Sequence, residues 1–258
     1  MSKKALSLLW RSPRSAGQIE GRRVDFLELF YDLIYVVIVA ELAHLLAAHV
    51  SFEAYLEFIF LFILIWWLWV NAALYHNLHG YDDLRTRIFA FMQMGILVMM
   101  TVFLHSAMQE SYGFVLSYVA FMILLTFLWW RTGVHDPAHR SSTIPFIITY
   151  PIGIALFIVS IFVPAPYRFA LWIIALLQMM IIPFIFSAIG ERGQYMSGLN
   201  IASSSLRERF KLFTIIVFGE TIVGVVAGLS RHHHLDFTIG VTGALGLILA
   251  FCLWWLYF

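Results

Sequence analysis

The sequence predicts an all-α protein that crosses a membrane several times, a polytopic transmembrane helical bundle. Of its 258 residues, 62% are hydrophobic and only 12% are charged, whereas a soluble domain carries roughly 25% charged residues. The mean hydropathy is +0.87. The hydrophobic residues form continuous runs of about 20, the length of a membrane-spanning helix, and they do not alternate with polar residues as in a β-barrel. The lipid bilayer is therefore the expected surroundings of most of the chain.

About eight such runs follow one another in a single domain. A basic cytoplasmic segment is expected at residues 1–23, and the helical bundle at residues 24–258. Each run is expected to be a helix because only helices and closed barrels satisfy their backbone groups in lipid. The candidate spans lie near residues 24–49, 54–78, 88–108, 112–130, 144–163, 169–189, 210–229 and 237–258.

The lysines and arginines predict the orientation of the bundle. With eight spans and a cytoplasmic N-terminus, 14 of the 16 Lys and Arg residues fall in cytoplasmic segments, and only Arg168 and Arg231 fall on the other side. This excess follows the positive-inside rule and predicts a multi-pass membrane protein with its N-terminus in the cytoplasm. The net charge is +1, and no basic face exists outside the loops, so no nucleic acid partner is expected.

Carboxylates inside the spans are the most informative residues, because a charge at the bilayer centre costs about 2.5–3.5 kcal/mol on insertion scales. Glu28 and Asp32 lie four residues apart on one face of the first span, and Glu220 lies about halfway along the seventh. We expect these three side chains to face a shared polar cavity, where they bind a cation or carry protons. Two simpler interpretations stay open. Glu28 could stabilise a helix N-terminus, and Asp32 or Glu220 could pair with Arg209 or Lys211.

Histidines accompany acids at two further places. Glu41 and His44 lie three apart later in the first span and are further candidates for binding an ion or a substrate. A second group, at the end of the second span, is a weak candidate for a metal site because its spacing matches no strict metal signature. A solvated helix end is the alternative. This group consists of His76, His79, Asp82 and Asp83. No cofactor is predicted, because no paired histidines suit haem and no lysine lies in mid-span for retinal.

Two motifs resemble the signatures of a known family. The run ELFYDLIYV at residues 28–36 resembles the opening signature of the bacterial low-temperature-requirement A (LtrA) family, and ERFKLFTIIVFGE at residues 208–220 resembles its second signature. A Trp-rich second span followed by YDD at residues 81–83 is also similar. The resemblance implies a multispan inner-membrane protein of a family named for a requirement in cold growth. The signature residues that it implicates in function are Glu28, Asp32, Arg209 and Glu220.

A possible internal repeat links the two ends of the sequence. A Leu-Phe pair, then an acid, then a Trp-rich cluster occurs in spans one and two and again in spans seven and eight. This order predicts a parallel repeat that starts near residue 207, so that the sequence is the first part of a two-repeat fold. We therefore expect the chain to be a truncated form or a fragment of a longer protein. The tryptophans themselves are expected to serve packing and interfacial anchoring.

Three functions are compatible with these features. The first hypothesis is a protein that moves a cation, a proton or a small solute by means of its membrane carboxylates and that supports growth at low temperature. The second is a sensor of membrane state or a structural membrane component. The third is an intramembrane enzyme that acts on lipid, with Asp32 or Glu220 as general acid or base. The absence of a strict metal or nucleophile motif weighs against the enzyme. The substrate and the oligomeric state stay open.

Overall fold

The computed structural model describes residues 24–79, 83–135, 140–189, 204–230 and 237–258. Within these ranges all regular secondary structure is helical, which confirms the predicted fold class. A short 3-10 helix, η2 (Leu104–Ser106), precedes α5. The long helices are α2 (Phe26–Ala48), α3 (Phe52–His79), α4 (Leu84–Val102), α5 (Tyr112–His135), α6 (Arg140–Ser160), α7 (Tyr167–Ile189), α9 (Ser204–Ser230) and α10 (Phe237–Tyr257).

Each of the eight long helices overlaps one of the eight predicted spans. Among the described residues, seven helices have the length and the hydropathy needed to cross a membrane, and α7 contains a shorter apolar stretch, Tyr167–Pro183. A membrane-spanning helix needs about 20 mostly apolar residues. The chain is thus a multi-pass helical membrane protein.

The third span differs from its predicted limits at both ends. Helix α4 begins at Leu84 rather than near residue 88, because Asp83 caps it and its Oδ1 accepts a 2.9 Å hydrogen bond from the backbone N–H of Thr86. Its last residue is Val102, and η2 follows after Phe103. The early start places Arg85 inside the helix instead of in the preceding loop.

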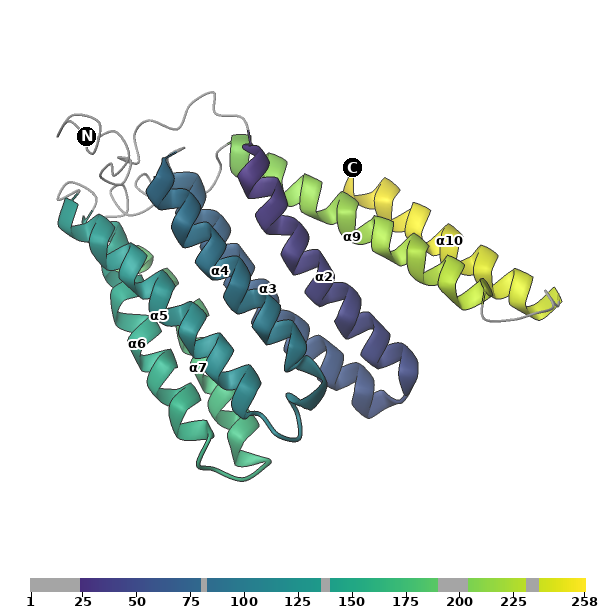
Figure 1. Ribbon diagram of the computed structural model, residues 1–258, viewed down its shortest axis with the longest axis horizontal. Helices are drawn as coiled ribbons and strands as arrows, with labels where there is room; N and C mark the ends of the chain where they lie inside the picture. The colour runs from purple at the N-terminus through teal and green to yellow at the C-terminus, as the bar shows by residue number, and fades with distance from the viewer. Residues whose placement is uncertain (1–23, 80–82, 136–139, 190–203, 231–236) are drawn as a thin grey trace. The chain divides into compact units, whose positions relative to one another are not determined.

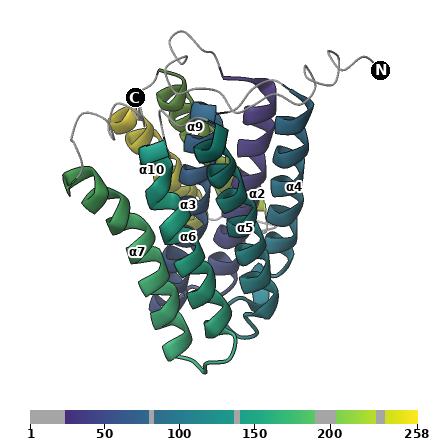
Figure 2. The same cartoon turned by 90° about the vertical axis from the view of Figure 1, so that its left-hand side faces the viewer.

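The chain divides into two compact units, one ending at Arg207 and the other running from Glu208 to Phe258. In the first unit, α5 packs on α4 and α6, α6 packs on α7, and α2 packs on α3 and α4. Figures 1 and 2 show that consecutive helices from α2 to α7 run in opposite directions. We call the end of this unit where α2 begins the N-terminal face, and the end where α2 finishes the opposite face.

The first unit has an apolar outside and a partly polar inside. Large apolar side chains such as Val37, Leu116 and Ile123 are exposed on its outer surface. Amides such as Asn77 and Gln93 are fully buried. This distribution is the reverse of a soluble protein's, and it suits helices that face lipid and pair their polar groups with one another.

Aromatic rings fill the interior between α5, α6 and α7. The rings of Tyr118 and Phe157 stack with their centroids 4.4 Å apart, and those of Trp129 and Phe146 stack at 4.1 Å. The indole N–H of Trp172 donates a 2.8 Å hydrogen bond to the hydroxyl of Ser160, so its polar atom is satisfied inside the bundle. These contacts make the α5–α7 side of the unit a tightly packed support for the more polar side at α2, α3 and α4.

The second unit contains the larger part of α9 and all of α10. The two helices approach closely where α10 carries glycine. A Cβ atom added at Gly243 would lie 2.8 Å from a methyl carbon of Leu229, and one added at Gly246 would lie 3.0 Å from a methyl carbon of Val225. Small residues permit such close helix contacts in membranes. The unit begins where the sequence predicts the start of a repeat, but the repeat itself stays a prediction.

Candidate functional site

Asp32 lies inside the helix bundle, bonded to a tryptophan of the neighbouring helix. Its carboxylate is 1% exposed, and the indole Nε1–H of Trp69 on α3 donates a 2.8 Å hydrogen bond to its Oδ1. Trp69 is itself fully buried. A hydrogen bond to a carboxylate is stronger than one between neutral groups, and its geometry fixes the carboxylate between α2 and α3. This pair is the centre of the candidate site.

Further polar groups of α2, α3 and α4 lie close to this pair. The hydroxyls of Tyr31 and Tyr35, on α2, lie 3.5 Å apart, and the ring of Tyr31 meets the imidazole of His76 edge-on with centroids 5.4 Å apart. His76 Nε2 is joined to Gln93 Oε1 of α4 by a 2.9 Å hydrogen bond. We call these six residues the polar core; they are Tyr31, Asp32, Tyr35, Trp69, His76 and Gln93.

A second set of hydrogen bonds ties α3 to more distant helices. The hydroxyl of Tyr150 on α6 donates to Asn71 Oδ1 at 2.7 Å, and the Asn71 amide donates to the backbone carbonyl of Trp67. Ser205, in the first turn of α9, donates a 2.6 Å hydrogen bond to Asn77 Oδ1. Helix α3 is therefore the element from which the polar groups of the interior spread to α2, α4, α6 and the start of α9.

Charged side chains are buried at the N-terminal face. Arg85 Nε lies 3.7 Å from Asp83 Oδ2, and both side chains are at most 3% exposed. Arg131 of α5 is also buried, and the hydroxyl of Thr132 donates to that of Tyr75 at 3.5 Å. Arginine in such a place is normally held by carboxylates or by hydrogen bonds. These residues form the polar end of the first unit, at the N-terminal face.

Glu28 serves the start of α2. The backbone N–H of Asp25 donates to Glu28 Oε2 at 3.2 Å, and the Asp25 side chain in turn caps the helix. This reciprocal arrangement is a capping box, which satisfies backbone donors that a helix leaves unpaired. Glu28 is 8% exposed and lies one turn before Asp32. The capping role is thus observed, and a role of Glu28 in binding an ion stays a prediction.

Glu41 and His44 lie near the opposite face, away from the polar core. Glu41 is about 14 Å farther along α2 than Asp32, from nine residues at the rise of a helix. Its carboxylate lies 3.6 Å from His44 Nδ1 and 3.3 Å from His105 Nε2 of η2. Both histidines are more than half exposed. The predicted neighbours Glu41 and His44 therefore contact each other but do not join Asp32.

Arg209 and Glu220 belong to the second unit, on α9. Arg209 is 1% exposed and Glu220 is half-buried. The predicted convergence of Glu220 with Glu28 and Asp32 on one cavity involves both units, and it stays a prediction. Within the first unit, Asp32 alone among the predicted carboxylates lies in the polar core.

The predicted metal candidates have other contacts. His76 binds Gln93, and the ring of His79 packs against Tyr75 and Trp129 with centroids 5.6 and 5.5 Å away. Asp83 caps α4, and Asp82 lies outside the described residues. In the part of the chain that the structure describes, no group of three or more His, Cys, Asp or Glu side chains is arranged to hold a metal ion.

Several residues of the site were not singled out from the sequence. The tryptophans were expected to serve packing and interfacial anchoring; Trp69 is packed in the interior, and its N–H is in addition the donor to Asp32. No role was predicted for Gln93, Asn71 or Tyr150. A signal was present for the two amides, because each stands in an apolar run, where an unpaired amide is costly. Tyr150 carries no such signal, since tyrosine is common in membrane helices.

The fold and the site define a polytopic helical membrane protein with a buried carboxylate among hydrogen-bonding aromatic, imidazole and amide groups. The chain belongs to the bacterial low temperature requirement A (LtrA) family, which it matches over residues 23–258. It is 26% identical over 245 residues to a protein of Rhizobium meliloti (strain 1021) that is described as uncharacterized. The match covers 92% of this chain and 58% of that relative, so the chain spans a little over half of the relative's length. No solved structure matches the chain significantly.

Proposed function

We propose that this protein moves a proton or a small cation across the membrane through the interior of α2–α7, and that Asp32 binds it on the way. The observation that carries the proposal is the position of Asp32. Its carboxylate is 1% exposed and lies about 9 Å along α2 from the first residue, from the rise of a helix. Acids inside spans are rare and costly, and they mark ion and proton pathways in membrane proteins.

The neighbours of Asp32 suit this role. Phenol and imidazole groups donate and accept protons, and the polar core holds both kinds, at Tyr31 and His76. Gln93 offers an additional donor, because its buried Nε2 has no hydrogen-bond partner among the described residues. A proton or cation bound at Asp32 would thus have groups able to donate or accept protons close to it.

An apolar layer separates the polar core from the opposite face. It consists of side chains that are each at most 3% exposed: Ile38, Leu42, Leu61, Leu64 and Leu97. In their helices these residues all lie farther from the N-terminal face than the polar core does. In the proposed mechanism this arrangement is a closed state, and transport requires the layer to open. A carboxylate that is accessible from one side at a time is what alternating access needs.

The same layer favours a second candidate function. A bundle whose polar groups are hydrogen-bonded inside and sealed by apolar side chains can also be a structural component of the membrane, or a sensor of its state. In that case the hydrogen bond between Asp32 and Trp69 stabilises the packing of α2 on α3 and conducts nothing. The two functions differ in one measurable property, which is flux.

Flux of ions into proteoliposomes tests the proposal. The purified chain is reconstituted in vesicles that contain a pH-sensitive dye, and a potassium diffusion potential drives proton uptake; parallel vesicles report sodium and potassium uptake. We expect flux above that of protein-free vesicles, and a loss of at least about tenfold in Asp32→Asn, equivalent to about 1.4 kcal/mol. Glu110→Gln is the matched control, because Glu110 is exposed in the loop before α5.

Absence of flux for all three cations, or equal flux in Asp32→Asn and the wild type, would contradict transport and leave the structural function. A loss of flux in Glu110→Gln as large as in Asp32→Asn would show that surface charge, not the polar core, controls the signal. Equal thermal denaturation midpoints for the variants exclude unfolding as the cause of any loss.

The inner membrane as location and the link to cold growth are further parts of the proposal. The distribution of Lys and Arg supports the first, and the description of the family supports the second. Both can be tested by complementation in a bacterial strain that has lost its own member of the family and cannot grow in the cold without it. The wild-type chain should restore growth at low temperature and fractionate with the inner membrane, and Asp32→Asn should fractionate in the same way without restoring growth.

A further inference from the structure

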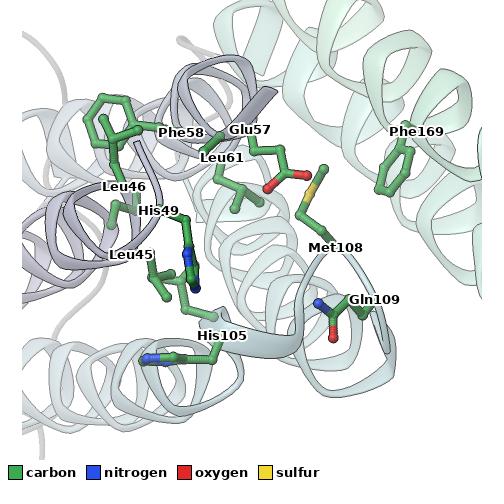
Figure 3. Close-up of a pocket in the computed structure, with 13 residues that line it drawn as sticks. Leu45, Leu46, His49, Glu57, Phe58, Leu61, His105, Met108, Gln109 and Phe169 are labelled. Atoms are coloured by element: carbon green, nitrogen blue, oxygen red, sulfur yellow. The ribbon is translucent and has the colours of Figure 1, made fainter. Parts of the chain in front are cut away.

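A cavity of about 330 Å³ opens at the opposite face of the first unit, away from the polar core. It lies between the end of α2, the first half of α3, the segment that contains η2, and Phe169 of α7. Figure 3 shows side chains from all four elements around it. Its volume is at the lower end of the range found for small-molecule sites in proteins, about 300–1,000 Å³.

The deep side of the cavity is apolar and closely packed. Leu42, Leu61 and Leu104 line it and are at most 3% exposed, so their far sides belong to the interior of the bundle. Phe58 and Phe169 contribute aromatic rings to its wall. A hydrophobic group of a ligand would therefore be removed from water here, which contributes favourably to binding.

The entrance of the cavity carries a carboxylate. Glu57 is exposed and lines the cavity, and Figure 3 shows its carboxylate oxygens directed toward Met108 on the other side. In the part of the chain that the structure describes, no cationic side chain is paired with Glu57. The guanidinium of the nearby Arg168 donates to the backbone carbonyls of Val163 and of Gln109, a residue that lines the cavity, and forms no ion pair with Glu57. Glu57 thus remains available to a cation from solution.

The other polar groups at the entrance add no fixed positive charge. His49 and His105 line the cavity, and the second of them already contacts Glu41 at 3.3 Å. Among the residues that line the cavity, Glu57 is the carboxylate. An acid at the mouth and an apolar, partly aromatic interior together match a molecule with one positive charge and a hydrophobic body.

We propose that this cavity binds a small organic monocation with an apolar body, such as an aryl- or alkylammonium, with Glu57 as its counter-ion. The site is distinct from the polar core and does not depend on the proposed transport, because binding is measured without flux. Glu53 provides an internal comparison: it lies one turn before Glu57 on the same helix and is exposed, but it does not line the cavity.

Calorimetric titration of the purified full chain in a non-ionic detergent tests the proposal. The probes are benzyltrimethylammonium, whose charge does not change with pH, its neutral counterpart benzyl alcohol and its anionic counterpart benzoate. We expect the cation to bind more tightly than the other two. In Glu57→Gln its dissociation constant should rise about fivefold, the equivalent of an exposed ion pair of about 1 kcal/mol. In Glu53→Gln it should be unchanged.

A second variant tests the cavity itself. Ala54 lines the cavity, and Ala54→Phe would fill it without changing any charge, so the cation should no longer bind while the thermal denaturation midpoint stays at the wild-type value. The proposal is overturned if benzyl alcohol or benzoate binds as tightly as the cation, if Glu57→Gln binds it like the wild type, if Glu53→Gln weakens binding as much as Glu57→Gln, or if folded Ala54→Phe still binds.

Discussion

The indole Nε1 of Trp69 lies 2.8 Å from Oδ1 of Asp32, and this contact joins α2 to α3 inside the first unit. Both side chains are at most 1% exposed. A buried carboxylate needs hydrogen-bond donors whether or not it takes part in transport. The bond therefore has two consequences that can be measured separately: it stabilises the bundle, and it positions the carboxylate.

Trp69→Phe should lower the stability of the protein. The phenyl ring keeps most of the packing but removes the N–H, so Asp32 loses one donor in a buried place at a cost of about 1–3 kcal/mol. The thermal denaturation midpoint of the purified chain should fall accordingly. Trp130→Phe is the control, because Trp130 is exposed on the outer surface of α5. An equal midpoint in Trp69→Phe and Trp130→Phe would mean that the hydrogen bond contributes nothing to stability.

Substitutions of Asp83 should separate its two roles. Its Oδ1 caps α4, and its Oδ2 lies 3.7 Å from the Nε of the buried Arg85. Asp83→Asn keeps a good capping residue but removes the charge beside the guanidinium, with an expected loss of about 3 kcal/mol. Asp83→Ala should lose about 1 kcal/mol more because the cap is also gone. Thermal denaturation of both variants gives the comparison. If the denaturation midpoint of Asp83→Asn equals that of the wild type, the charge of Asp83 does not stabilise the protein, and its contribution to stability comes from the helix cap alone.

Two glycines in helices should respond to alanine with opposite signs. A Cβ added at Gly133 on α5 would lie 2.7 Å from the Oγ1 of Thr143 on α6, a residue with no exposed surface. Gly133→Ala should therefore destabilise by about 1–3 kcal/mol, because the Thr143 side chain or one of the helices must shift. Nothing lies within 4 Å of a Cβ at Gly95 on α4. Gly95→Ala should be neutral or stabilise by up to about 1 kcal/mol, since alanine favours a helix. A midpoint of Gly133→Ala at or above the wild-type value would contradict the packing of α5 on α6.

The helices could be predicted from the sequence because hydrophobicity over about 20 residues is a local property. The limits of α4 were predicted less well, and Arg85 shows why. An arginine was taken to mark a loop, yet its guanidinium lies 3.7 Å from the Asp83 carboxylate inside the bundle. Partners of this kind depend on how the helices rotate and pack, which hydrophobicity does not specify.

The candidate site, like the helix limits, could be predicted from the sequence only in part. Asp32 could be recognised because a carboxylate in an apolar run is costly and rare. Its partner Trp69 could not, because the two residues lie 37 positions apart and a tryptophan has an ordinary anchoring role in membranes. Glu41 lies on the same helix as Asp32 and was grouped with it, but nine residues of helix place the two acids about 14 Å apart along the axis.

Chemical labelling should establish the orientation that the positive-inside rule predicts. Ser51, between α2 and α3, lies at the opposite face, and His135, at the end of α5, lies at the N-terminal face; both are exposed. The sole cysteine of the chain, Cys252, is exposed and must first be replaced by alanine.

In the cysteine-free background, Ser51→Cys should react with a membrane-impermeant maleimide in intact spheroplasts. His135→Cys should react only after the membrane is permeabilised, because 14 of the 16 Lys and Arg residues are predicted to hold that face in the cytoplasm. The cysteine-free variant gives the background signal. Labelling of His135→Cys but not of Ser51→Cys in intact spheroplasts would invert the orientation and place the polar core near the outer surface.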